Sequence, residues 1–164
     1  MLIALISDTH LPRGQRALPD SCIEHLKRSD LIIHAGDIST VDVLKQIEAI
    51  GPPVAAVYGN QDEAALARTL PEARTVDADG AKIAVIHDAG AATGRLNRMR
   101  KRFPEATAVV FGHSHIPLHE TSPDGNFQIF NPGSPTDKRR QPNFTMGLAR
   151  ARARSVEFEL VELS

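Results

Sequence analysis

Residue types that bind metals follow a series of short apolar runs in this chain. The runs at residues 2–6, 31–33, 54–58, 83–86 and 108–111 are rich in aliphatic side chains, as buried strands are. The polar residues that come after them include Asp8, His10, Asp37, Asn60, His87, His113 and His115. In open α/β sheets the carboxyl ends of the strands face one crevice, where ligands bind. The sequence therefore predicts that these side chains meet at a site for divalent cations.

Length and composition indicate a globular protein with an aliphatic core. The chain has 164 residues, of which 41% are hydrophobic and 24% charged, and we expect one domain over residues 1–164. The formal net charge of −1 gives no general attraction to nucleic acid or to an anionic membrane. Cys22 is the only cysteine, so an internal disulfide is excluded. No apolar run approaches the roughly 20 residues that cross a bilayer, and we expect a cytoplasmic protein.

The first half of the chain alternates strand-like and helix-like segments. Helices are predicted at residues 19–28, after a cap at Ser39 or Thr40, and at residues 62–68. Strands are predicted at residues 2–6, 31–34 and 54–58. This βαβαβ order predicts a largely parallel sheet.

The second half is expected to be richer in strands. A hairpin is predicted around Asp79-Gly80, between strands at residues 74–78 and 82–86. A helix is predicted at residues 93–103, and further strands are predicted at residues 108–111, 127–130, 145–150 and 156–161. The late strands favour a second, mostly antiparallel sheet.

The order of the polar motifs resembles that of the calcineurin-like metallophosphoesterase superfamily, and most closely its short prokaryotic phosphodiesterases. The motifs are Asp8-Thr9-His10, Gly36-Asp37, Gly59-Asn60-Gln61-Asp62, His87, Gly112-His113-Ser114-His115 and the later loop Asn131-Pro132-Gly133-Ser134. The resemblance covers nearly the whole chain. It implies an α/β fold in which two packed β-sheets are flanked by helices, a metallophosphoesterase-like sandwich.

The resemblance also implies a ligand set for two divalent metal ions. Asp8, His10 and His115 would bind the first ion, and Asn60, His87 and His113 the second. Asp37 would bridge both. Mixed imidazole, carboxylate and amide ligation suits Mn²⁺, which we expect, and also Fe, Zn²⁺ or Ni²⁺. The implied reaction is hydrolysis of a small phosphodiester by a metal-bridging hydroxide that attacks phosphorus in line, while Asn60 offsets charge on the phosphoryl oxygens.

Two positions depart from the pattern of many superfamily members. Gln61 stands where those members have a histidine that protonates the leaving oxygen, and an amide has no proton to give. Phosphomonoesters with poor leaving groups are therefore disfavoured as substrates. Asp88 follows His87 where a glycine is common, and it either orients His87 or a water, or caps the next loop. Asp62 is expected to bond backbone groups, and His34 to be buried and hydrogen-bonded.

Some of the basic residues are predicted to bind substrate, and others are not. Arg13, three residues after His10, and Arg139, in the basic loop at residues 138–140, are predicted to bind substrate. The basic residues within 93–103 are interpreted as a solvated helix face.

Two alternatives to a phosphodiesterase are considered. The first is a non-catalytic protein-binding scaffold on the same fold, as in the retromer subunit of this superfamily, and the second is a phosphomonoesterase or nucleotide hydrolase. The complete ligand set favours the enzyme, and family analogy suggests a homo-oligomer.

Overall fold

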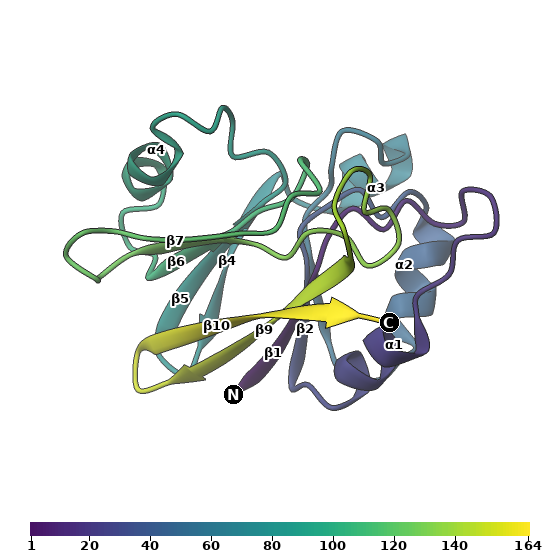
Figure 1. Cartoon of the computed structure of the whole chain (residues 1–164), viewed down its shortest axis with the longest axis horizontal. Coiled ribbons are helices and arrows are strands. Elements are labelled where there is room, and N and C mark those ends of the chain that lie inside the picture. Colours follow the sequence, from purple (N-terminus) through teal and green to yellow (C-terminus); the bar gives the residue numbers. More distant parts are fainter.

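Two mixed β-sheets of five strands pack face to face, and helices cover their outer faces (Figure 1). The computed structural model describes residues 1–164. The α/β fold class predicted from the sequence is confirmed. None of the helices is long and apolar enough to pass through a bilayer.

The first sheet has the strand order β10-β9-β1-β2-β3. Its parallel part is the predicted one, with β1 (Leu2–Ile6), β2 (Leu31–His34) and β3 (Val54–Ala56) side by side. The long strands β9 (Phe144–Arg152) and β10 (Ser155–Leu163) extend it in antiparallel fashion from β1.

The second sheet has the order β4-β5-β6-β8-β7. Its members are β4 (Ala73–Ala78), β5 (Ala81–Ile86), β6 (Ala108–Val110), β7 (Leu118–Thr121) and β8 (Gln128–Asn131). The predicted hairpin of β4 and β5 is confirmed, but β5, β6 and β8 are parallel, and only the two edge strands are antiparallel to their neighbours.

The expectation that the last strands would join a mostly antiparallel second sheet was wrong. The strands β9 and β10 belong to the first sheet, where β9 pairs with β1 in the register Ile3↔Ala149. The alternation of apolar and polar residues along a strand indicates which of its faces is buried, but it does not identify the strand with which it pairs.

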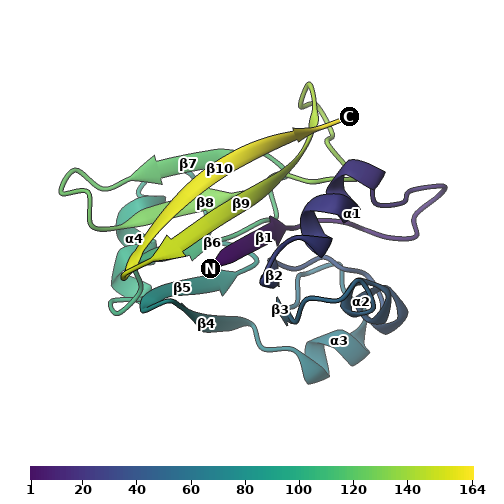
Figure 2. The same cartoon turned by 90° about the horizontal axis from the view of Figure 1, so that it is seen from below.

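The helices form the outer layers of the molecule. As Figure 2 shows, α1 (Asp20–Lys27), α2 (Val41–Glu48) and α3 (Ala64–Thr69) lie beside the first sheet, whereas α4 (Arg95–Arg102) lies on the other side of the molecule, against the second. Thr40 caps α2 as predicted, because its hydroxyl accepts the Val43 N–H at 3.3 Å.

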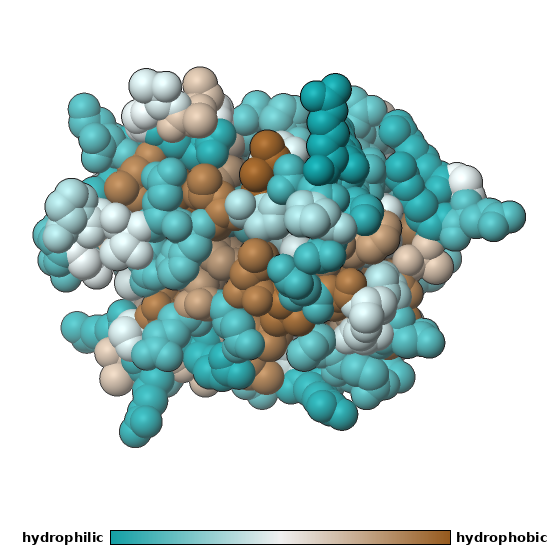
Figure 3. Space-filling model, in the orientation of Figure 1, coloured by the Kyte–Doolittle hydropathy of each residue, from teal (hydrophilic) through white to brown (hydrophobic).

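Three apolar clusters hold these layers together. The cluster between the sheets includes Leu5, Ile33, Val85 and Val110, and the other two join each sheet to its helices. Phe130 of β8 stacks on Phe158 of β10, with ring centroids 4.7 Å apart, and so connects the two sheets. On the face in Figure 3, apolar atoms surface mainly near the middle, inside a hydrophilic periphery.

Candidate metal centre

All the residues predicted to bind a metal lie beyond the carboxyl ends of parallel strands. Asp8 and His10 follow β1, and Asp37 follows β2. The other candidates follow β3, β5 and β6, and they are Asn60, His87, His113 and His115. The loops that carry them meet at one end of the two sheets, in the upper part of Figure 1.

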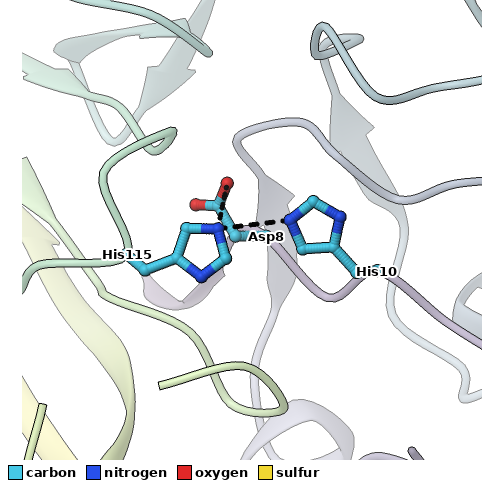
Figure 4. Close-up of side chains that lie close together, drawn as sticks. All are labelled: Asp8, His10 and His115. Atoms are coloured by element: carbon cyan, nitrogen blue, oxygen red, sulfur yellow. Dashed lines mark hydrogen bonds and ion pairs between the residues drawn. The ribbon is translucent and has the colours of Figure 1, made fainter. Parts of the chain in front are cut away.

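One group of donors consists of Asp8, His10 and His115 (Figure 4). The Nε2 atom of His115 lies 3.2 Å from Nε2 of His10 and 3.5 Å from Oδ1 of Asp8. All three side chains are buried. The group therefore presents two imidazoles and one carboxylate to a common point.

A second group consists of Asn60, His87 and His113. The Asn60 Oδ1 atom lies 3.0 Å from Nε2 of His87 and 3.1 Å from Nδ1 of His113. The rings of the two histidines meet edge to face, with centroids 5.2 Å apart. This group presents an amide oxygen and two imidazoles.

Asp37 lies between the two groups. Its Oδ2 atom is 3.5 Å from Nε2 of His10 and 3.4 Å from Nε2 of His87. Its other oxygen, Oδ1, accepts the backbone N–H of Gln61 at 2.8 Å. One carboxylate thus contacts a histidine of each group, and all the predicted ligands form one continuous cluster.

The backbone at this cluster adopts an uncommon conformation. Asp8, His10, Asp37, His113 and His115 have φ angles between 45° and 70°, in the left-handed region that side chains disfavour. Such a residue costs about 1–3 kcal/mol and persists only where its surroundings enforce it. Strained positions of this kind gather at functional sites, and these five belong to the predicted ligand set.

Two glycines allow the cluster to close. A Cβ atom on Gly59 would collide with the carboxylate and backbone nitrogen of Asp37, and one on Gly112 would collide with the side chains of Ser7 and Asp8. The glycine before Asn60 and the glycine before His113 therefore let neighbouring loops approach closely.

Hydrogen bonds fix the tautomers of two histidines. The Nδ1 atom of His87 lies 2.8 Å from the carbonyl oxygen of Ala35, and Nδ1 of His115 lies 2.6 Å from that of Asp137. A carbonyl only accepts, so Nδ1 carries the proton and donates it. In the neutral rings the lone pair on Nε2 then faces the cluster, as in metal-binding histidines.

Burial and neighbouring charges shift the pKa values of the residues in this cluster in both directions. Burial lowers the pKa of His10 to about 4, so its ring is neutral at pH 7. Burial alone would raise the pKa of Asp37, but the hydrogen bond and charge of His87 hold it below its ordinary value. Burial is likewise outweighed at His87, whose pKa is raised by Asp37. The buried Nδ1 of His10 has no hydrogen-bond partner. The donor set of oxygens and imidazole nitrogens therefore fits divalent metal ions.

Three neighbouring polar residues support the loops. Asp62 accepts the N–H groups of Ser39 and Gly59, each at 2.7 Å, which confirms the prediction for this residue. His34 is fully buried; its Nδ1 accepts the Gly36 N–H at 3.2 Å, and its Nε2 donates to the Thr9 hydroxyl at 3.0 Å. Both nitrogens are occupied, as predicted.

Asp88 caps its loop. Its Oδ1 accepts the Gly90 N–H at 2.8 Å, whereas the Nδ1 proton of His87 goes to Ala35. Of the two roles considered for Asp88, the structure favours the cap over the orientation of His87.

Two residues that hold the loop after β1 in place were not predicted from the sequence. The Ser134 hydroxyl donates to the Asp8 carbonyl at 2.8 Å, and the Thr136 hydroxyl donates to the Thr9 carbonyl at 2.6 Å. These bonds tie the loop between β8 and β9 to the turn that carries Asp8 and His10. The Asn131-Pro132-Gly133-Ser134 motif was the sequence signal for this loop.

The interpretation of α4 as a merely solvated basic face was wrong for two of its arginines. The Arg98 guanidinium donates to the carbonyls of Ala89 at 2.8 Å and Ala91 at 2.6 Å, and Arg95 donates to that of Gly90 at 3.0 Å. These side chains hold the loop that follows His87. Their function in packing a loop depends on tertiary structure that a charge pattern does not reveal.

The two arginines predicted to bind substrate lie at an open cleft beside the cluster. The cleft encloses about 290 Å³, and its lining consists of His10, Arg13, Asp37, Asn60, Gln61, His113, Asp137 and Arg139. The Arg13 Nη2 atom donates to Oε1 of Gln61 at 3.4 Å. The wall of the cleft thus combines four of the predicted ligands, His10, Asp37, Asn60 and His113, with two guanidinium groups.

Comparisons with known proteins point to one family. Residues 1–154 match the family described as the calcineurin-like phosphoesterase superfamily domain. A protein of Methanothermobacter thermautotrophicus, named a probable metallophosphoesterase, is 33% identical over 141 residues, which span 85% of this chain and 80% of that protein.

Solved structures share the fold. Zinc-complexed Vps29 from Entamoeba histolytica has a TM-score of 0.77 at 19% identity, with 100% of both chains covered. A structure described as a novel archaeal phosphodiesterase has a TM-score of 0.74 at 22% identity, with 98% of this chain and 100% of that one covered. From the family match and the close relative, the chain belongs to the calcineurin-like phosphoesterase superfamily.

Proposed function

We propose that this protein is a metal-dependent phosphodiesterase whose cluster holds two divalent cations. The observation that carries the proposal is the position of Asp37, whose Oδ2 lies within 3.5 Å of His10 and 3.4 Å of His87. A carboxylate shared by two sets of donors is the arrangement that a two-metal phosphoesterase requires.

The proposed ligands divide as the two groups do. Asp8, His10 and His115 would hold one cation, Asn60, His87 and His113 the other, and Asp37 both. When bound, the cations would polarise the phosphoryl oxygens and lower the pKa of an attacking water. We propose Mn²⁺ as the native ion, since imidazole, carboxylate and amide oxygen together suit it.

The protein's own groups orient this site. The carbonyls of Ala35 and Asp137 hold His87 and His115 in the tautomer whose Nε2 carries no proton. The Asn60 side chain lies at the cleft and would also stabilise charge on the phosphoryl group. Arg13 and Arg139, on the wall of the same cleft, would contact the substrate.

The identity of residue 61 supports a diester rather than a monoester substrate. Gln61 lines the cleft, and its Oε1 accepts a hydrogen bond from Arg13. An amide cannot protonate a leaving alkoxide, so turnover would favour diesters with leaving groups that depart without a proton.

The substitution Asp37→Asn tests the proposal. We expect the variant to bind less metal and to lose at least about a hundredfold in kcat/KM on bis(p-nitrophenyl) phosphate, because a neutral amide offsets less cation charge. Metal content is measured by plasma mass spectrometry after reloading the metal-free protein with Mn²⁺. The control is Asp20→Asn, which neutralises an exposed carboxylate on α1.

Retention of full metal content and a near-normal rate by Asp37→Asn would contradict the bridging role. Stoichiometric metal binding with no hydrolysis of any phosphoester by the wild-type protein would favour the scaffold alternative, a function compatible with the shared fold of Vps29.

A further inference from the structure

The cleft beside the metal centre has a basic wall, whose two guanidinium groups form no ion pair within the protein. Neither Arg13 nor Arg139 is within ion-pair distance of a carboxylate. Two other basic residues of the same loops are engaged, since Arg16 pairs with Asp137 at 3.2 Å and Lys138 donates to the Pro142 carbonyl at 2.8 Å, whereas Arg140 is exposed and does not line the cleft. Arg13 and Arg139 are therefore guanidinium groups that line the cleft and form no ion pair within the protein.

The two arginines reach the cleft from different loops. Arg13 follows β1, and its single bond to Gln61 leaves most of its N–H donors free. Arg139 comes from the loop between β8 and β9, where its φ angle of 49° is left-handed and its side chain is exposed. Of the two carboxylates that line the cleft, Asp137 pairs with Arg16, and Asp37 belongs to the candidate metal centre.

A second pocket that also includes Asn60 has a different lining. It is lined by Tyr58, Gly59, Asn60, Glu72, Ile86, His87 and Asp88. It has two carboxylates and no basic residue apart from His87. The two pockets share Asn60, so a group bound at Asn60 borders both a basic region and an acidic, partly apolar one.

We infer that the substrate is an asymmetric phosphodiester in which one substituent ends in a second oxyanion, a carboxylate or a phosphate, that binds Arg13 and Arg139. Guanidinium groups bind such oxyanions through paired hydrogen bonds. The uncharged or hydroxyl-bearing substituent would lie toward Tyr58 and Asp88, because their pocket repels an anion. This inference rests on the proposed phosphodiesterase function and adds the charge of the substrate to it.

A matched pair of substrates tests the inference. p-Nitrophenyl 2-carboxyethyl phosphate and p-nitrophenyl propyl phosphate have the same leaving group and differ in one carboxylate. We expect the Mn²⁺-loaded wild-type protein to hydrolyse the carboxylate ester with about tenfold higher kcat/KM, the value of one charged hydrogen bond. Arg13→Gln and Arg139→Gln should each bring the ratio close to one. A 2-phosphoethyl ester in a third arm tells whether phosphate or carboxylate is preferred.

Arg140→Gln is the control variant. Arg140 is exposed in the same loop as Arg139 and does not line the cleft, so its loss changes the net charge equally. We expect it to keep the wild-type ratio. If Arg13→Gln and Arg139→Gln also keep that ratio while both esters are hydrolysed, the oxyanion subsite is refuted and the phosphodiesterase function stands.

Binding provides a readout that does not depend on turnover. By calorimetry, 3-phosphonopropionate should bind the wild-type protein about tenfold more tightly than propylphosphonate, and Arg139→Gln should abolish the difference. If neither ester is hydrolysed, the proposed function fails and this comparison still decides the subsite. Equal affinity of the two phosphonates for the wild-type protein would overturn the inference.

Discussion

The proposed ligands are held by backbone turns that their own side chains disfavour. His113 has a φ angle of 70°, and its backbone N–H donates to Oδ2 of Asp8 at 3.0 Å. The turn therefore sets one histidine toward Asn60 and at the same time ties the loop after β6 to the carboxylate after β1. Part of the stability of the fold is expended to hold these residues in place.

Replacing His113 measures that strain. His113→Ala and His113→Gly both remove the imidazole, but alanine keeps the Cβ atom that opposes a left-handed backbone. We expect the glycine variant of the metal-free protein to be the more stable by about 1 kcal/mol in urea unfolding, despite the greater freedom of glycine in the unfolded chain. An alanine variant more stable than the glycine variant would show that the turn carries no appreciable strain.

The strands that deliver the ligands were predictable because each motif is local. Leu2–Ile6 followed by Asp8 and His10 has its strand and its ligands within a few residues, and so do Leu31–His34 and Asp37. The parallel order then places their ends together. The pairing of β9 with β1 was not predictable, since Ala149 meets Ile3 across most of the chain. Nor could a sequence pattern show that Arg98 binds the carbonyls of Ala89 and Ala91.

Phe130 and Phe158 show how two strands from different sheets depend on each other. Phe130 is buried in β8, Phe158 is half-buried in β10, and their rings stack at an interplanar angle of 9°. His119 of β7 lies edge-on to both rings, with centroids 5.6 Å from each. The contact joins β10, the edge strand of the first sheet, to β8, which is next to the edge strand of the second sheet.

A double-mutant cycle tests this contact. Phe130→Leu and Phe158→Leu should each destabilise the protein, and the loss in the double variant should be smaller than the sum by about 0.5–1.5 kcal/mol, the value of an aromatic pair. Urea unfolding of the four proteins gives the coupling energy. Additive losses would mean that the rings contribute by burial alone.

A buried histidine, His34, supports the loops of the candidate metal centre. It is the last residue of β2, and its hydrogen bonds link Thr9, after β1, to Gly36, in the turn before Asp37. Burial, with a further contribution from the charge of His87, lowers the pKa of His34 to about 3. The histidine is consequently neutral in the folded protein under all but strongly acidic conditions.

The buried histidine makes the stability of the whole molecule depend on pH. In the unfolded chain His34 has the ordinary pKa of about 6.5, so below that pH only the unfolded state gains its proton. The contribution of His34 to the free energy of unfolding is therefore complete above pH 6.5. It falls as the pH drops toward 3, by up to about 2.7 kcal/mol at pH 4.5.

We expect His34→Gln to lose less stability than the wild-type protein between pH 7 and pH 4.5. Urea unfolding of both proteins in EDTA measures the difference without bound metal, and because His10 remains in both, it cancels from the comparison. Parallel losses in the two proteins would mean that His34 accepts its proton in the folded state, which its buried bonds to Thr9 and Gly36 oppose.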